Sequence, residues 1–243
     1  MYHKELARSG KALFTIRGAY IYTVIIGSIL IAWASGNMGP FGEAGADLGW
    51  QVAGFVVALG AAIWRIIIGG YAALGTSGNA KKQAVAAELN TTGPYSVVRN
   101  PLYVGRIMNF TGLAMLSGSW VYAAIVFLVS VLIYERISIY EELFLADKFG
   151  DAHAKWAESV PALLPRLTGW VKPKYPFWWR RAIRREYKKL FQLATAVIAC
   201  DFARRGFELP ENLTLYYVYA GCVVLRLAVG AARQFGKAFD GIE

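Results

Sequence analysis

The chain has 243 residues, of which 56% are hydrophobic, and its mean hydropathy is +0.39. This composition is too apolar for an ordinary soluble domain of that length and indicates a membrane protein. The 26 Lys and Arg outnumber the 16 Asp and Glu, which gives a net charge of +10. Such a charge suits nucleic acid, an anionic lipid surface or an anionic substrate. Because the chain contains long apolar runs, we expect a lipid surface and no nucleic acid.

The first two candidate membrane spans are the apolar runs 15–34 and 48–70. A helix of about twenty residues crosses a hydrocarbon core of about 30 Å. The first run has that length and lacks a convincing cleavage site, so we interpret it as a span and not as a signal peptide. Arg65 comes late in the second run, where it could reach the interface or face a polar cavity.

The next apolar runs, 103–118 and 120–134, are separated only by Ser119, which predicts a tight helical hairpin. No Pro or Gly follows before Gly150, so the last helix is predicted to continue to about Phe149. Lys and Arg are found before the first run and between the second and third, but not in the other two connections. By the positive-inside rule, the N-terminus and the motifs described below face the cytoplasm, as in a bacterial inner membrane.

The composition changes after Pro165. A basic and aromatic stretch is predicted to lie on an anionic lipid leaflet, or alternatively to be a solvated helix face. Its cations are Arg180, Arg181, Arg184, Arg185, Lys188 and Lys189. The apolar runs 190–203 and 213–230 are predicted to form a helical pair that packs on the core, because the first has only about fourteen residues. A six-span bundle is the alternative. Cys200 and Cys222 lie in these runs and are expected to be packing residues.

The predicted fold is therefore all-α: a polytopic membrane helical bundle with a cytoplasmic-face pocket and a C-terminal helical extension. We divide the chain into an N-terminal two-span region (1–92), a core with the polar motifs (93–166) and a basic C-terminal region (167–243).

Two adjacent carboxylates, Glu141 and Glu142, follow the fourth apolar run. On a helix Glu142 shares a face with Glu135 and Ser138, and Glu141 is offset by about 100°. Carboxylates placed this close repel each other unless a cation or a ligand lies among them. The candidate cations are Arg99, Arg106 and Arg136. The alternative is a solvated helix end with ordinary surface charges.

The stretch 93–103, GPYSVVRNPLY, precedes the third apolar run. Its Asn-Pro pair favours an extended residue at Asn100, and Pro101 suits the first turn of a helix. The turn is expected to present backbone N–H groups and Arg99 towards the helix start, where an anion is favoured. Alternatively, the turn only separates two segments.

The pattern G-P-Y-x-x-x-R-N-P-x-Y, followed by E-E-x-x-L-x-x-x-F-G and V-P-x-x-x-P, resembles the C-terminal core of the isoprenylcysteine carboxyl methyltransferase and phospholipid methyltransferase families of membrane proteins. The resemblance covers 93–165. The matching residues are Gly93, Pro94, Tyr95, Arg99, Pro101, Tyr103, Gly105, Glu141, Glu142, Leu145, Phe149, Gly150, Val160, Pro161 and Pro165.

The resemblance implies that S-adenosylmethionine binds at the cytoplasmic face and that a lipid enters from the bilayer. It implies cofactor contacts at Tyr95, Arg99, Asn100, Pro101, Tyr103, Glu142 and Leu145. It implies roles at the reacting centre for Glu141, Glu142, Arg99 and Arg136. The chain departs from the family pattern at Asn100, where the families usually have His, and at His153 and Trp156, where they usually have Tyr.

S-adenosylmethionine carries a sulfonium and a carboxylate, so a site with both Glu and Arg suits it, and methyl transfer needs mainly positioning of the reactants. We expect a methyltransferase whose acceptor is a phospholipid amine, with Glu141 or Glu142 taking the proton. A second possible acceptor is the carboxylate of a prenylated cysteine or another small lipid-like molecule. Two further hypotheses are an NADPH-dependent membrane reductase, which would use Lys81 and Lys82, and a non-catalytic lipid-binding protein. No metal site is expected.

Overall fold

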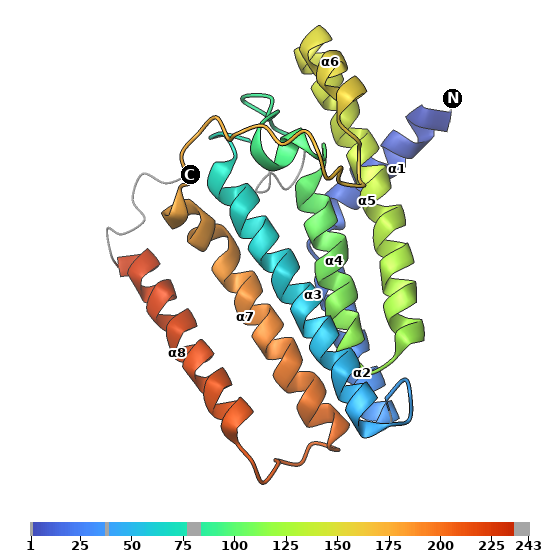
Figure 1. The fold of residues 1–243 in the computed structure, drawn as a ribbon, viewed down its shortest axis with the longest axis vertical. Coiled ribbons are helices and arrows are strands. Elements are labelled where there is room, and N and C mark those ends of the chain that lie inside the picture. Colours follow the sequence, from blue (N-terminus) through green and yellow to red (C-terminus); the bar gives the residue numbers. More distant parts are fainter. Residues whose placement is uncertain (1, 37–38, 77–83, 236–243) are drawn as a thin grey trace.

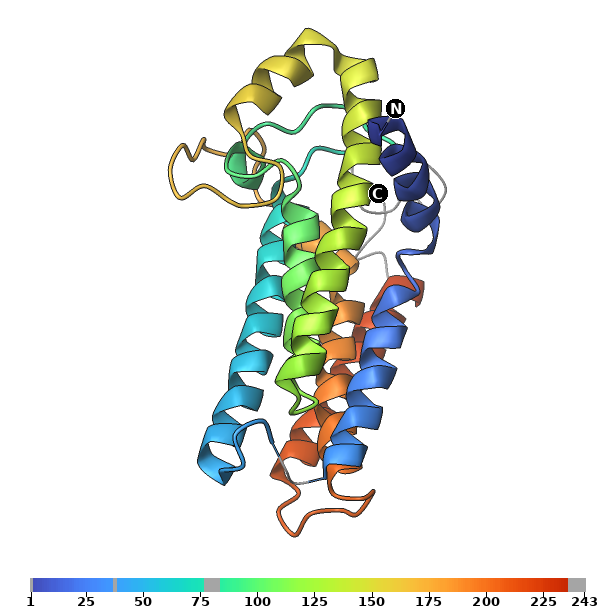
Figure 2. The same cartoon turned by 90° about the vertical axis from the view of Figure 1, so that its right-hand side faces the viewer.

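The computed structural model describes residues 2–36, 39–76 and 84–235. Within these ranges the chain forms eight α-helices and one 3-10 helix, and the long helices run side by side as a bundle (Figure 1). The predicted all-α bundle is confirmed. The loops that carry the proline motifs lie together at one end of the bundle (Figure 2).

The N-terminal apolar run is divided between two helices, α1 (Tyr2–Ile16) and α2 (Tyr20–Ser35), which meet at an angle of 70°. The predicted span 15–34 is therefore wrong at its start, because the chain turns at 17–19. Helix α2 runs along the bundle, whereas α1 lies beside the upper part of α5 (Figure 2). The turn contains Gly18, whose low helix propensity helps to interrupt the helix.

Helix α1 packs along α5 (Trp120–Phe149). Phe14 of α1 is buried, and Gly10 lies against the backbone carbonyl of Arg136. A side chain at Gly10 would overlap that carbonyl, so the glycine permits the close approach of the two helices. The amphipathic helix α1 is thereby held next to the part of α5 that carries the Glu pair.

The two central helices, α3 (Ala44–Tyr71) and α4 (Pro101–Met115), pack through small residues. Gly112 of α4 lies against Gly54 and Ala58 of α3, where a larger side chain would overlap the neighbouring backbone. Small residues of this kind let membrane helices approach closely.

Helices α4 and α5 form the predicted tight hairpin. The Ser119 hydroxyl caps α5 by accepting a hydrogen bond from the Tyr122 backbone N–H at 3.2 Å. Helix α5 then continues unbroken to Phe149, as predicted, and ends at Gly150, which has a φ of +50°. Because α5 is continuous, it carries the Glu pair beyond its apolar part.

The C-terminal region contains α6 (Asp151–Ser159), α7 (Trp179–Arg204) and α8 (Thr214–Phe235). Helix α7 packs against α2 and α3, and α8 lies along α7 (Figure 1). The run 190–203 is thus the second half of a helix of 26 residues that begins in the basic stretch. At about 1.5 Å per residue this helix is as long as a membrane core.

The chain is an integral membrane protein. Within the described residues, α3, α5 and the part of α8 at 214–234 are long and apolar enough to cross a membrane, and the bent α1–α2 pair could form a fourth span. Apolar side chains of α8 face outwards; Val224, for example, is 66% exposed.

The basic stretch at the start of α7 is only partly on the surface. Arg181 is 1% exposed and donates hydrogen bonds to three carbonyls at the end of α3, those of Gly69, Gly70 and Ala72. Carbonyls at a helix end lack partners within the helix, so the guanidinium caps α3. The prediction of a leaflet contact is therefore wrong for Arg181, whereas Arg180 and Lys188 are exposed.

Candidate active site

The first motif forms a short 3-10 helix, Gly93–Ser96, and an extended segment that leads into α4. The later proline motif lies beside it. The backbone N–H groups of Arg99 and Asn100 donate to the carbonyls of Pro161 and Ala162 at 2.8 and 3.2 Å. Two motifs that are far apart in the sequence therefore form one structural unit.

This pairing corrects the expectation that the turn offers its backbone N–H groups to an anion. The N–H groups of Arg99 and Asn100 are donated to the proline segment, and Pro101 has no N–H group. An anion at this end of the site would therefore be recognised by side chains and not by these backbone groups.

Arg99 and Glu142 form a bidentate ion pair that joins the first motif to α5. The Nε and Nη2 atoms of Arg99 lie 3.0 and 2.9 Å from the two carboxylate oxygens, an arrangement that orients both side chains. The Arg99 Nη1 atom donates to the carbonyls of Ala157 and Val160 at 2.6 and 3.0 Å. The Asn100 amide donates to Glu142 at 2.9 Å. Arg99 is thus the cation that compensates Glu142.

A cavity opens beside this network, between α1, α3, α4, α5 and the loop 84–90. Its empty volume, including the space at its open side, is about 940 Å³. The structure brings most of the predicted site residues into its lining: Tyr95, Arg99, Asn100, Pro101, Tyr103, Glu141 and Leu145.

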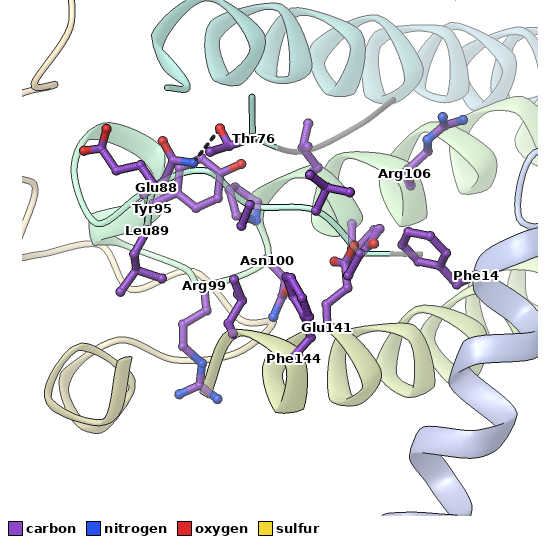
Figure 3. A pocket seen from close by; sticks show the side chains of 18 of the residues that line it. Phe14, Thr76, Glu88, Leu89, Tyr95, Arg99, Asn100, Arg106, Glu141 and Phe144 are labelled. Carbon is purple, nitrogen blue, oxygen red and sulfur yellow. Dashed lines mark hydrogen bonds between the residues drawn. The ribbon is translucent and has the colours of Figure 1, made fainter. Parts of the chain in front are cut away.

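Glu141 lies in the middle of the cavity lining, between Asn100 and Phe14 (Figure 3). Its carboxylate faces the Tyr103 side chain, and the charge of Arg17 acts on it from the turn between α1 and α2. Glu141 is therefore placed to face a bound molecule, whereas the carboxylate of Glu142 is held by Arg99.

Two of the predicted catalytic residues do not line the cavity. Arg136 faces α1 and donates to the Ser9 hydroxyl at 3.3 Å. Glu142 reaches the cavity only through Arg99 and Asn100, which it holds in place. The guanidinium of Arg99 itself points away from Glu141 (Figure 3).

The predicted polar face of α5 is not uniform. Glu135 is exposed, Glu142 is half-buried, and Ser138 is buried and donates to the Tyr134 carbonyl at 2.7 Å. Only Glu142 of this face takes part in the network beside the cavity.

Helix α6 closes one side of the cavity. The indole N–H of Trp156 donates to the Tyr95 carbonyl at 3.1 Å, and the ring lines the cavity. His153 packs edge to face on Trp156, with ring centroids 5.8 Å apart. Burial lowers the pKa of His153 and so favours its neutral form. Of the two α6 positions that differ from the resembling families, Trp156 is therefore in the cavity wall and His153 packs against it.

Sequence reasoning missed Arg17 at the other end of the cavity. Arg65, for which the sequence left open the interface or a polar cavity, lines this end together with Arg106, which the sequence suggested only as a possible partner of the Glu pair. Arg65 is bound to Glu186 of α7. An arginine within an apolar run was the available signal, because such residues usually mark functional sites in membrane proteins.

The paired polar motifs thus lie around a cavity at one end of a helical membrane bundle. Residues 50–152 match the family model described as phospholipid methyltransferase, and this segment of the chain is similar to that family. The segment includes the whole of α4 and α5 and the first motif.

Three curated relatives match over part of their length. The chain is similar to the cobalt-zinc-cadmium resistance protein CzcN of Cupriavidus metallidurans, with 38% identity over 33% of this chain and 37% of the relative. It is similar to the nickel-cobalt-cadmium resistance protein NccN of Alcaligenes xylosoxydans xylosoxydans, with 37% identity over 34% and 38%. It is also similar to the protein-S-isoprenylcysteine O-methyltransferase of Schizosaccharomyces pombe, with 33% identity over 32% and 34%.

The chain thus spans little more than a third of the length of the curated relatives that it matches. No solved structure matches the chain.

Proposed function

We propose that the protein is an S-adenosylmethionine-dependent membrane methyltransferase that acts on a lipid, and that the acceptor is a phospholipid amine. The observation that carries this proposal is the cavity itself, which is lined by the motif residues and bounded by the Arg99–Glu142 ion pair. The match of residues 50–152 to the phospholipid methyltransferase family model supports it. Region 93–166 supplies just over half of the residues that line this cavity.

The residues present fit the cofactor by their chemistry. The lining combines carboxylate, guanidinium, amide and aromatic groups, which suit a molecule with a sulfonium, a carboxylate and an adenine ring. When bound, S-adenosylmethionine supplies an electrophilic methyl group. Tyr95, Asn100, Pro101, Tyr103 and Leu145 would contact it, and Arg99 and Glu142 would hold that wall in position.

The acceptor nitrogen must carry a lone pair before it can form a bond to the methyl carbon, as the sulfur–carbon bond breaks. Glu141 lines the cavity, so its carboxylate is placed to accept the proton that the amine loses. Arg136 has no role in this proposal, because it is bonded to Ser9 and lies outside the cavity.

A carboxyl acceptor is the second candidate. The arginines at one end of the cavity favour it, and the similarity to an isoprenylcysteine methyltransferase is in line with it. Such an acceptor needs no base, because a carboxylate oxygen already carries a lone pair.

The same proposal places the cavity and the N-terminus on the cytoplasmic side of a bacterial inner membrane. The exposed cations of α7, Arg180 and Lys188, with the half-buried Arg184, would contact an anionic leaflet. The residues suggested for a reductase, Lys81 and Lys82, lie outside the described residues.

Calorimetry of the purified protein with S-adenosylhomocysteine and with NADPH tests the proposal. We expect S-adenosylhomocysteine to bind. Binding of NADPH alone would establish the reductase hypothesis, and binding of neither would favour a non-catalytic lipid-binding protein.

Methyl transfer from labelled S-adenosylmethionine to lipid extracts gives a second test. Arg99→Ala and Glu142→Gln are each expected to abolish transfer, because each breaks the network that holds the cavity wall. Glu208→Gln, at an exposed position between α7 and α8, is the matched control and should retain activity. Wild-type rates in both site variants would exclude these residues from the site.

A further inference from the structure

The end of the cavity near α7 carries more positive charge than the neighbouring carboxylate balances. Arg65 and Lys189 both bond to Glu186, at 3.1 and 2.5 Å, so one carboxylate serves two cations. Arg106 lies near this cluster, because Arg65 and Glu186 are among the charges that act on it. Within the described part of the chain, no carboxylate bonds Arg106, which lies over the ring of Phe110 at 5.9 Å.

A guanidinium in this position favours an anion. Removing an unpaired charge from water costs several kcal/mol, and arginine does not avoid this cost by losing its proton. Arg17 adds to the effect, since it lines the same cavity and its charge acts on both Arg106 and Glu141. The three arginines come from α3, α4 and the α1–α2 turn and converge on one end of the cavity.

We propose that Arg106, with Arg65 and Arg17, forms a subsite for the negatively charged group of the acceptor lipid. This inference rests on the proposed function, of which it specifies the acceptor class. A phosphodiester and a carboxylate both suit the forked geometry of a guanidinium. The acceptor is therefore an amphiphile that carries one of these anions.

The order of residues along the cavity fits this assignment. Figure 3 shows Arg106 and Phe14 at one end, Glu88 and Leu89 at the other, and Glu141 between them. A lipid whose anion binds at Arg106 would present its neighbouring atoms to Glu141, where we place the proton acceptor.

Glu186 acts as a positioning residue for this subsite. Its oxygens accept two hydrogen bonds from Arg65, at 3.2 and 3.1 Å, and Arg65 also donates to the Leu102 carbonyl at 3.1 Å. Glu186 lies on α7, outside the segment 50–152 that matches the family. The C-terminal region of this chain therefore helps to shape the subsite.

The test is calorimetric titration of the detergent-purified protein with dodecyl phosphate and, separately, with dodecanoate, without any cofactor. We expect at least one of these anions to bind the wild type and to bind Arg106→Gln about tenfold more weakly, which corresponds to the loss of one hydrogen bond to a charged group. Arg106→Lys keeps the positive charge but loses the paired N–H donors of the guanidinium. Its affinity for the anion should therefore lie between those of the wild type and Arg106→Gln. Arg233→Gln, at an exposed position on α8, is the matched control and should bind like the wild type.

Thermal unfolding separates a ligand-binding arginine from a structural one. Because no carboxylate of the described residues pairs with Arg106, Arg106→Gln should unfold at the wild-type temperature or above it, whereas loss of a structural arginine would lower that temperature. Stronger binding of dodecyl phosphate would favour an acceptor with a phosphate group, and stronger binding of dodecanoate an acceptor with a carboxylate.

The inference is overturned if neither anion binds the wild type, or if both bind Arg106→Gln as they bind the wild type. It is also overturned if Arg106→Gln is strongly destabilised, because the arginine would then be structural. These outcomes are independent of the calorimetry with S-adenosylhomocysteine. If the anion binds and S-adenosylhomocysteine does not, the anion subsite is supported and the proposed methyltransferase activity is contradicted.

Discussion

Two arginine–glutamate pairs with the same geometry lie beside the cavity. In both, the Nε and Nη2 atoms of the arginine bond to the two carboxylate oxygens, at 3.0 and 2.9 Å for Arg99–Glu142 and at 3.2 and 3.1 Å for Arg65–Glu186. Their surroundings differ. The side chains of the first pair are 17% and 22% exposed, and those of the second are 7% and 5% exposed.

The difference shows that one kind of contact can serve two purposes. Arg99 has further partners in two carbonyls, so the first pair fixes the loop before α4 against α5 and the end of α6. Glu186 is shared between Arg65 and Lys189 deep in the bundle, so the second pair fixes helix α7 against α3. We therefore expect the first pair to matter mainly for cofactor binding and the second mainly for stability.

Glu186→Gln should give the largest loss of stability. The substitution leaves the buried Arg65 and the half-buried Lys189 without a carboxylate, and breaking a buried ion pair such as Arg65–Glu186 costs about 3–5 kcal/mol. Denaturant unfolding in detergent micelles measures the free energy of unfolding, with Glu208→Gln as the exposed control. A loss as small as that of the control would show that the buried pair is not what holds α7.

Glu142→Gln should cost less stability but remove cofactor binding. The free energy of unfolding is expected to fall by about 1–2 kcal/mol, because Arg99 keeps its two carbonyl partners and the pair is partly exposed to water. Measuring both variants in the same micelles tests whether the buried pair contributes more to stability than the partly exposed pair. If the two losses were equal, burial would not distinguish the two pairs.

Asn100→Ala should have a smaller effect in the same direction. The side chain donates to Glu142 at 2.9 Å and to the Ala162 carbonyl at 3.2 Å, and one hydrogen bond contributes about 1 kcal/mol. We expect about a fivefold to tenfold weaker affinity for S-adenosylhomocysteine by calorimetry. Unchanged affinity would show that Arg99 and Glu142 keep the cavity wall in place without Asn100.

The Arg99–Glu142 pair could be foreseen in part, whereas the buried pair could not. Arg99 and Glu142 belong to recognisable motifs, and the need of adjacent carboxylates for a cation left Arg99, Arg106 and Arg136 as candidates. Arg65 and Glu186 are 121 residues apart and belong to two apolar or basic runs. Periodicity and composition do not reveal which charges of such runs meet, because that depends on how α7 packs on α3.

Helix continuity was predictable where local signals decide it. The absence of Pro and Gly predicted that α5 reaches Phe149, and the short connection predicted the α4–α5 hairpin. The bend at 17–19 was missed, because hydrophobicity continues through it and the direction of α1 depends on its packing against α5. The start of α7 was missed because its basic residues looked like a surface segment, although Arg181 finds its partners at the end of α3.

The smallest expected effect concerns His153, which packs against Trp156 in the cavity wall. Burial lowers the pKa of His153 below the ordinary value of 6.5, so the unfolded chain binds a proton more readily than the folded protein. The contribution of the neutral imidazole to stability is therefore fully present above about pH 6.5 and is lost as the pH falls through the lowered pKa. Denaturant unfolding between pH 7.5 and 5 should show this loss in the wild type and a weaker one in His153→Gln. An identical pH dependence in both proteins would mean that His153 titrates like an exposed histidine, and that the wall around Trp156 does not depend on its neutral form.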